Sequence, residues 1–259
     1  MVVHKFIHRV EKVIESYPQT VDKTRPLCYN EAMRPDFAAI SALIEKNSEK
    51  FAKFYGMLVE SNAKYNLTAI TEKKEVYIKH FLDSLAGEVL LFKGASVVEV
   101  GSGGGFPSVP LMLVRSDLHF TLVESTGKKC DFLREVIREF GLDATVKNAR
   151  AEDCGRDVSL REKFDICIAR AVARLNTLSE YCFPLVKKGG CMIAYKGNAE
   201  EELKEAKSAI SILGGASAET FLYELPEGYG ARTLVRIQKE KNTPEKYPRG
   251  QGKERSKPL

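Results

Sequence analysis

A glycine-rich turn at the end of a β-branched run constrains the fold of this chain more than any other feature. Residues 97–107 read VVEVGSGGGFP, so four glycines fall within the five positions 101–105. Glycine suits a turn of this kind because a side chain would block the close approach of backbone amides to a ligand. The pattern therefore predicts a strand that ends in a ligand-binding turn, and a plain tight turn is the alternative.

An acidic residue stands at the tip of the next expected strand. The apolar run 119–123 ends in Glu124, twenty-three residues beyond Gly101. An acid in this position is placed to bind the two hydroxyls of a ribose. Turn and acid together predict a cofactor that contains a nucleoside.

The residues after the turn distinguish two such cofactors. Dinucleotide-binding folds place a third glycine where Phe106 stands, followed here by Pro107 and Pro110. Proline is tolerated at the start of a helix but not in its interior, so the turn should be wide and the helix late. A bulky aromatic ring suits a cofactor without phosphates, which favours S-adenosylmethionine over NAD.

Strand-like and helix-like segments alternate from residue 96 onward. Strands are expected at 97–101, 119–124, 144–148, 164–169 and 190–195, with helices at 108–115, 127–140, 174–186 and 199–213. This alternation predicts a parallel sheet with helices on both faces. Two further strands, 219–225 and 232–238, have no helix between them and should form a terminal antiparallel pair. The expected fold is α/β, a Rossmann-like seven-stranded sheet.

The amino-terminal part reads differently, and three segments are expected. Residues 1–35 form an extension with no assigned role, which we expect to be dispensable for cofactor binding. Residues 36–93 show helical periodicity and should pack on the core, and residues 94–259 form the α/β domain that holds the cofactor, with a basic tail.

Composition limits the location, the metal content and the kind of partner that we expect. The chain is 44% hydrophobic, lacks an apolar run long enough for a membrane span, and does not start with a secretory signal, so a cytoplasmic location without membrane contact is expected. Six cysteines show no metal-ligand spacing and are expected to be free thiols, with no metal site. The net charge is +5, and the basic tail 239–257 favours a polyanionic partner, a solvated tail being the alternative.

Taken together, these segments resemble the glucose-inhibited division protein B family, the bacterial 16S ribosomal RNA guanine-N7 methyltransferases. The resemblance covers about residues 36–259 and rests on linked motifs: KYNLTAI (64–70), HFLDSL (80–85), VEVGSGGGFPSVPL (98–111), LVESTGKKCDFLREV (122–136), NARAED (148–153), FDICIARAVA (164–173), AYKG (194–197) and TPEKYPRGQG (243–252). This resemblance implies a class I methyltransferase that uses S-adenosylmethionine.

The resemblance also implies site residues. Those carried over for the cofactor are Gly101, Gly103, Phe106, Glu124, Ser125, Thr126, Ala151, Glu152 and Arg170. Arg170 and Lys196 are positioning candidates rather than catalytic ones. The alternative is a structural ion pair for Arg170, which we favour less, and the start of a turn for Lys196. The candidates for RNA binding are Lys128, Lys129, Arg134, Lys196, Lys246 and Arg249, and a solvated helix face is the alternative for the first three.

Guanine N7 has an in-plane lone pair, so methylation needs no general base and should rest on alignment and electrostatics. The expected partner is small-subunit ribosomal RNA or a ribosomal particle, and a monomer is expected. Two other hypotheses stay open at this point: an NAD-dependent oxidoreductase and a non-catalytic RNA-binding module that keeps the methyltransferase fold.

Overall fold

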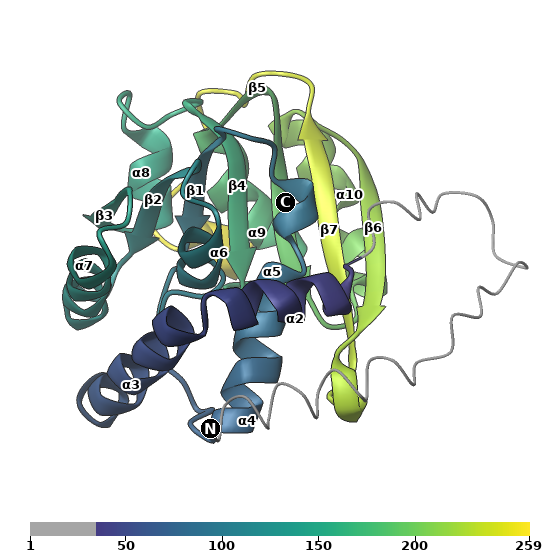
Figure 1. The fold of residues 1–259 in the computed structure, drawn as a ribbon. Coiled ribbons are helices and arrows are strands. Elements are labelled where there is room, and N and C mark those ends of the chain that lie inside the picture. The colour runs from purple at the N-terminus through teal and green to yellow at the C-terminus, as the bar shows by residue number, and fades with distance from the viewer. Residues whose placement is uncertain (1–34) are drawn as a thin grey trace, which may run out of the picture.

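A seven-stranded sheet separates two layers of helices in the computed structural model, which describes residues 35–259 (Figure 1). The strand order is β3-β2-β1-β4-β5-β7-β6. The strands are β1 (Ser96–Val100), β2 (His119–Glu124), β3 (Ala144–Asn148), β4 (Phe164–Arg170), β5 (Val186–Lys196), β6 (Gly215–Glu224) and β7 (Ala231–Lys239). β1 to β5 pair in parallel, whereas β7 pairs antiparallel with both β5 and β6, so the predicted fold class is confirmed.

Because side chains alternate along the strands, the core divides into two clusters, one on each face of the sheet. We call the one under α2 (Phe37–Lys46), α3 (Ser48–Tyr65) and α6 (Ser108–Val114) the front cluster and the one under α9 (Leu175–Cys182) and α10 (Glu200–Leu213) the rear cluster. On β1, Val97 belongs to the front cluster, whereas Val98 and Val100 belong to the rear one. The front cluster is also covered by the continuous helical stretch α4–η2–α5 (Lys73–Val76, Tyr77–Leu82 and Asp83–Leu85) and by α7 (Gly127–Phe140). The rear cluster is also covered by α8 (Ala151–Arg156) and the short α11 (Lys253–Ser256).

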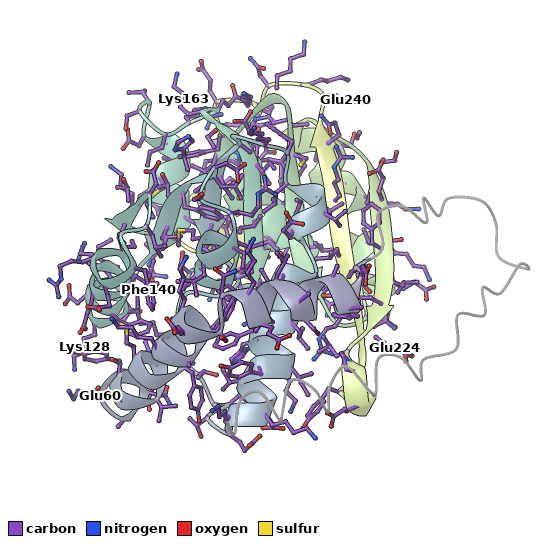
Figure 2. All side chains as sticks on the ribbon, in the orientation of Figure 1. Glu60, Lys128, Phe140, Lys163, Glu224 and Glu240 are labelled. Carbon is purple, nitrogen blue, oxygen red and sulfur yellow. The ribbon has the colours of Figure 1, made fainter. Side chains whose placement is uncertain are left out.

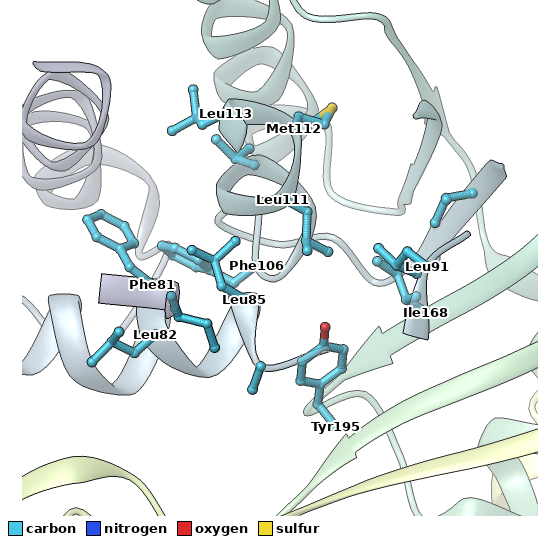
Figure 3. Close-up of a cluster of buried hydrophobic side chains, with 14 of the residues drawn as sticks. Phe81, Leu82, Leu85, Leu91, Phe106, Leu111, Met112, Leu113, Ile168 and Tyr195 are labelled. Atoms are coloured by element: carbon cyan, nitrogen blue, oxygen red, sulfur yellow. The ribbon is translucent and has the colours of Figure 1, made fainter. Parts of the chain in front are cut away.

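Aromatic side chains of the front cluster join the amino-terminal helices to the glycine turn (Figure 3). Phe81 packs against Phe51, Phe54 and Phe106, with ring centroids 5.0, 5.7 and 6.1 Å away. Figure 3 shows Phe81 near Phe106. Aromatic pairs at these separations stabilise a core beyond the area that they bury. Residues 36–93 are therefore part of one core with the sheet.

Local pattern and structure differ in several places. β6 begins at Gly215 rather than 219, and the expected helix 174–186 is α-helical only to Cys182. β5 begins at Val186 rather than 190, and a register shift between Phe164 and Ile166 accommodates the extra residues 187–190. Within the segment 36–93, where helices were expected, a π-helix stands at Tyr77–Leu82. α8 was not predicted, since a helix of six residues is too short to show a periodic pattern.

The tail 239–257 is docked on the rear layer, although Lys241, Lys246, Lys253 and Lys257 stay exposed. Lys239 is fully buried and donates to the carbonyls of Phe183 and Val186, and Tyr247 joins the rear cluster. Arg161 donates to the carbonyls of Thr243 and Tyr247 at 2.8 Å, which fixes the middle of the tail. The tail is part of the folded domain.

Between residues 35 and 259, no helix combines the length and the apolar character that crossing a membrane requires. Cys130, Cys154, Cys167, Cys182 and Cys191 are free and buried, whereas Cys28 and the remainder of segment 1–34 lie outside the described residues. The role predicted for the amino-terminal extension is thus not tested by the fold.

Candidate functional site

The glycine turn follows β1 at the carboxyl end of the parallel strands, where open α/β sheets bind ligands. Gly101, Gly103 and Gly105 all have positive φ, of 73°, 51° and 86°. A Cβ atom at Gly101 would lie 2.6 Å from Cγ2 of Val172, so this position excludes a side chain for two reasons, backbone conformation and space. At Gly103 the space is open, and only the backbone conformation demands glycine.

Glu124 lies at the end of β2, as predicted, and touches the turn directly. Its carboxylate accepts hydrogen bonds from the backbone N–H groups of Gly103, at 3.0 Å, and Thr126, at 2.7 Å. Ser125 and Thr126 follow as exposed residues at the start of α7. The carboxylate, the glycine turn and the first turn of α7 therefore form one rigid unit.

The end of β3 lies beside this unit. Asn148 donates from its side-chain amide to the Glu124 carbonyl at 3.1 Å, and the N–H of Ala149 donates to the same carbonyl at 3.2 Å. The next residues enter α8, whose first turn carries the half-buried Ala151 and Glu152. The structure thus gathers the predicted residues of three strand ends at one edge of the sheet.

Phe106 and Arg170 occupy the front side of this edge. Phe106 is only 6% exposed and stacks on His80, with ring centroids 4.4 Å apart. The guanidinium carbon of Arg170 lies 5.2 Å from the centroid of the Phe106 ring. The ring expected beside the cofactor is therefore mostly a core residue that supports the turn from below.

Arg170 is held by the π-helix of the front layer. One terminal nitrogen of its guanidinium donates to Asp83 at 2.9 Å and to the Lys79 carbonyl at 3.1 Å, and the other lies 3.0 Å from Nδ1 of His80. Since arginine only donates, Nδ1 of His80 accepts, and Nε2 donates to the Thr68 hydroxyl at 2.8 Å. Burial, with the charge of Arg170, lowers the pKa of His80 to about 3, so this histidine stays neutral.

Glu99 was missed by sequence reasoning, although an acid inside a run of valines was a visible signal. It is fully buried on β1, two residues before Gly101; no hydrogen bond of normal geometry reaches either carboxyl oxygen from the described residues, although the Ser102 and Ser108 hydroxyls lie near enough to affect its pKa. Burial raises the pKa of Glu99 to about 7, against the opposing effects of Ser108, Arg170 and Ser102. A buried carboxyl group without a partner marks a place for a polar or cationic ligand group.

We expect this group to make stability depend on pH. Because the pKa of Glu99 is about 7 in the folded protein against an ordinary 4.5, the folded state holds the proton more tightly and loses stability as pH rises from 4.5 to 7. Replacing Glu99 by glutamine removes this loss. Between pH 4.5 and 8, the free energy of unfolding of Glu99→Gln should gain about 2–3 kcal/mol relative to the unsubstituted protein. Urea titrations without ligand measure it, and a constant difference would contradict the assignment.

The lysines and arginines predicted for RNA have unequal surroundings. Lys128 is exposed and Lys129 half-buried at the start of α7, whereas Arg134 pairs with Asp131 on the helix surface at 2.9 Å. Lys196, at the end of β5, donates to the Ala173 carbonyl at 2.6 Å and to Glu202 at 2.7 Å. Its ammonium group is engaged within the protein.

Two candidates in the tail are not brought to this site. Arg249 forms a bidentate ion pair with Glu180, which is fully buried. Lys246 is exposed, but its neighbour Tyr247 is bonded to Arg161, which precedes β4 and so lies towards the opposite edge of the sheet. These roles could not be read from the sequence because the partners are 69 and 86 residues away.

A cavity of about 310 Å³ also lies at that opposite edge. Its lining includes Leu118 and Asp143, which immediately precede β2 and β3. It is therefore remote from the glycine turn, Glu99 and Glu124, and is not part of the candidate site.

Comparisons with known proteins match the part of the chain that contains these strand ends. The model of a family described as rRNA small subunit methyltransferase G (GidB) matches residues 47–225. The ribosomal RNA small subunit methyltransferase G of Lactobacillus johnsonii is 48% identical over 223 residues, which cover 84% of this chain and 93% of that protein. The protein of the same name from Staphylococcus epidermidis is 48% identical over 221 residues, covering 84% and 92%.

Among solved structures, a SAM-dependent O-methyltransferase from Thermotoga maritima is similar, with a TM-score of 0.50 and 15% identity. The match covers 72% of this chain and 73% of that one. At this level of identity the similarity is one of fold, and the fold is that of the class I methyltransferases.

Proposed function

Because this chain belongs to the family of rRNA small subunit methyltransferase G, we propose that it transfers a methyl group from S-adenosylmethionine to N7 of a guanine in 16S ribosomal RNA. The observation that carries this proposal is the family match over residues 47–225, which spans the glycine turn, Glu124 and Arg170. The 48% identity to relatives over nearly their whole length supports the same reaction.

The residues at the strand ends fit this cofactor. The turn at Gly101 and Gly103 offers backbone N–H groups without side chains, and Glu124 keeps acceptor capacity for the ribose beyond its two backbone bonds. Ala151 and Glu152 would lie on the adenine side. Glu99 is a buried carboxyl group in need of a donor, which the ammonium group of a methionine moiety can supply. When bound, S-adenosylmethionine supplies a methyl group on a positively charged sulfur.

The acceptor needs little chemical help from the protein. Guanine N7 carries a lone pair in the plane of the ring, so no proton has to leave before the methyl group arrives. His80 is neutral and fully engaged with Thr68 and Arg170, and it is not required as a base. We therefore assign the protein the task of alignment, with Arg170 as a positioning residue at the mouth of the site.

Contacts to the RNA backbone are assigned first to Lys128 and Lys129. In Figure 2, Lys128 lies at the same end of the molecule as Glu224, the last residue of β6, whereas Lys163 and Glu240 lie at the opposite end. β6 runs in the direction of the parallel strands, so Lys128 is at the carboxyl edge, near the glycine turn. Within residues 35–259 no ion pair engages either lysine, which leaves both available for phosphates.

Replacing Lys128 and Lys129 together by alanine should raise the Michaelis constant for RNA and leave the affinity for S-adenosylmethionine unchanged. Each lost phosphate contact should also lower the slope of log K against log salt concentration by roughly 0.7–0.9. Methyl transfer measured at several salt concentrations tests this. As a control, Lys163 and Lys187, at the opposite edge of the sheet, are replaced together by alanine, which should change neither the Michaelis constant for RNA nor the salt slope. If both double variants had the same effect, α7 would not be part of the RNA-binding surface.

The reaction itself is tested in cells with and without the gene. Nucleosides released from 16S ribosomal RNA are separated and weighed by mass spectrometry, and one 7-methylguanosine should be lost without the protein. Persistence of every 7-methylguanosine, or loss of a mark on another atom, would refute the assignment of the acceptor.

Three finer points belong to the same proposal. We propose that the enzyme works in the cytoplasm as a monomer, on ribosomal RNA or on a ribosomal particle. Residues 94–259 are proposed to carry cofactor and RNA, with 36–93 as a supporting helical segment and residues 1–35 dispensable for cofactor binding. Methyl transfer to naked RNA and to graded assembly intermediates would identify the substrate form.

A further inference from the structure

The loop after β4, residues 171–175, lies directly against the glycine turn. Val172 fills the space in which a Gly101 side chain would stand, with Cγ2 only 2.6 Å from the Cβ position. Ala171 has a φ of 56°, which a residue with a Cβ atom rarely adopts. A backbone of this kind persists only where surrounding contacts fix it.

Two side chains outside the loop provide those contacts. Lys196, from the end of β5, donates to the Ala173 carbonyl at 2.6 Å and to Oε2 of Glu202 at 2.7 Å. The same Oε2 accepts the Leu175 N–H at 2.8 Å, so Glu202 of α10 ties down the far end of the loop. Only 10% of the Lys196 side chain and 17% of the Glu202 side chain are exposed.

A second ion pair reaches the same loop, but it stabilises the loop less because it is exposed to solvent. Arg174 donates to Glu205 at 2.9 and 2.8 Å, but about half of each side chain is exposed. Exposed pairs of this type contribute little to stability. The mostly buried pair of Lys196 and Glu202 is therefore the contact that fixes the loop.

We propose that Lys196 and Glu202 form a latch that positions the loop 171–175 over the cofactor turn for methyl transfer. The inference rests on the proposed function for the reaction that the loop serves. Both are positioning residues, because they act on the loop backbone rather than on cofactor or RNA. The ammonium group of Lys196 already has two acceptors within the protein, which argues against a phosphate contact.

The latch and a phosphate contact make opposite predictions for three variants: Lys196→Gln, Glu202→Gln and the double variant. If the two residues act as one latch, each single variant should lower kcat about tenfold and raise the Kd for S-adenosylmethionine about threefold. The Michaelis constant for RNA and its salt dependence should stay unchanged. The double variant should be no worse than the poorer single variant, because contacts in one network are not additive.

A matched control lies on the same helix. Lys204 and Glu200 of α10 pair at 2.9 Å, are largely exposed and do not touch the loop. Lys204→Gln and Glu200→Gln should leave kcat, both binding constants and the loop unaffected.

Hydrogen exchange gives a readout that does not depend on activity. In the free protein, the Leu175 amide should exchange at least about tenfold faster in Lys196→Gln and in Glu202→Ala, which removes the acceptor, than in the two control variants. If Lys196→Gln does not fold, Glu202→Ala alone carries this test. If the unsubstituted enzyme methylates no ribosomal RNA, the proposed function fails. The exchange rate of the Leu175 amide would still show whether Lys196 and Glu202 fix the loop.

Two results would overturn the inference. One is unchanged exchange at Leu175 in Glu202→Ala. The other is a Lys196→Gln variant with normal kcat, a raised Michaelis constant for RNA and a smaller salt slope, since that combination identifies a phosphate contact.

Discussion

Replacing Gly101 by aspartate should abolish the binding of S-adenosylmethionine, with Kd raised at least about a hundredfold. The backbone there has a φ of 73°, which costs a residue with a side chain roughly 1–2 kcal/mol. The new Cβ would also lie 2.6 Å from Val172, so the loop after β4 would have to move away. The added carboxylate would stand beside the carboxylate of the methionine moiety. Calorimetry on the variant measures the loss.

Gly189→Asp is the matched control for that experiment. Gly189 has a φ of 86°, no atom lies within 4 Å of its Cβ position, and it is exposed. It therefore carries a similar backbone strain without an effect on the site, and should bind the cofactor normally. Titration with NAD should show no binding to the unsubstituted protein. An unchanged affinity of Gly101→Asp for S-adenosylmethionine would sink the assignment of the turn.

Replacing Asp83 by alanine should lower the free energy of unfolding by about 3–5 kcal/mol, the range found when one partner of a buried ion pair is removed. Asp83 is 4% exposed and accepts from Arg170 at 2.9 Å and from the Tyr223 hydroxyl at 2.8 Å. The alanine variant would leave the guanidinium group and the hydroxyl without this acceptor. Since domains are stable by about 5–15 kcal/mol, the loss is a large part of the total. Urea unfolding measures it.

The surface pair of Asp131 and Arg134 is the control for Asp83. It has the same residue types and the same distance of 2.9 Å, but 69% of the aspartate and 50% of the arginine side chain are exposed. Asp131→Ala should therefore cost about 0–1 kcal/mol. Asp83→Asn should fall between the two, because it keeps an acceptor for Tyr223 and loses the charge opposite Arg170. Equal costs for Asp83→Ala and Asp131→Ala would show that burial does not matter here.

Sequence patterns predicted the sheet well because they depend on neighbours along the chain. Strand β2 and helices α7 and α10 were predicted to within a residue at each end, and the glycine turn and Glu124 were placed correctly at two strand ends. The end of β5 was predicted to within a residue, but its start was not, because residues 187–189 read as a turn before the expected strand 190–195. The strand instead continues through them, and at Gly190 a Cβ atom would lie 2.3 Å from the Asp165 carbonyl oxygen.

The roles of individual charged side chains could not be predicted in this way. Arg249 and Lys196 were expected to meet RNA, and both have partners inside the protein. Glu99 was passed over, although its lack of a partner makes it the most informative carboxyl group of the site. A charge in a sequence carries no record of which distant group lies against it.

By itself, the sequence of this protein determined the alternation of strands and helices, the turn that admits no side chain at Gly101, and the acid at the next strand tip. These follow from periodicity and backbone geometry, which act over a few residues. Only the tertiary structure decided that Arg170 is held by Asp83 and His80, that Lys196 bonds the loop beside the turn, and that the tail is docked on the domain through Tyr247. The reason is that burial and pairing set the free energy of a charge, and both arise only when distant segments meet.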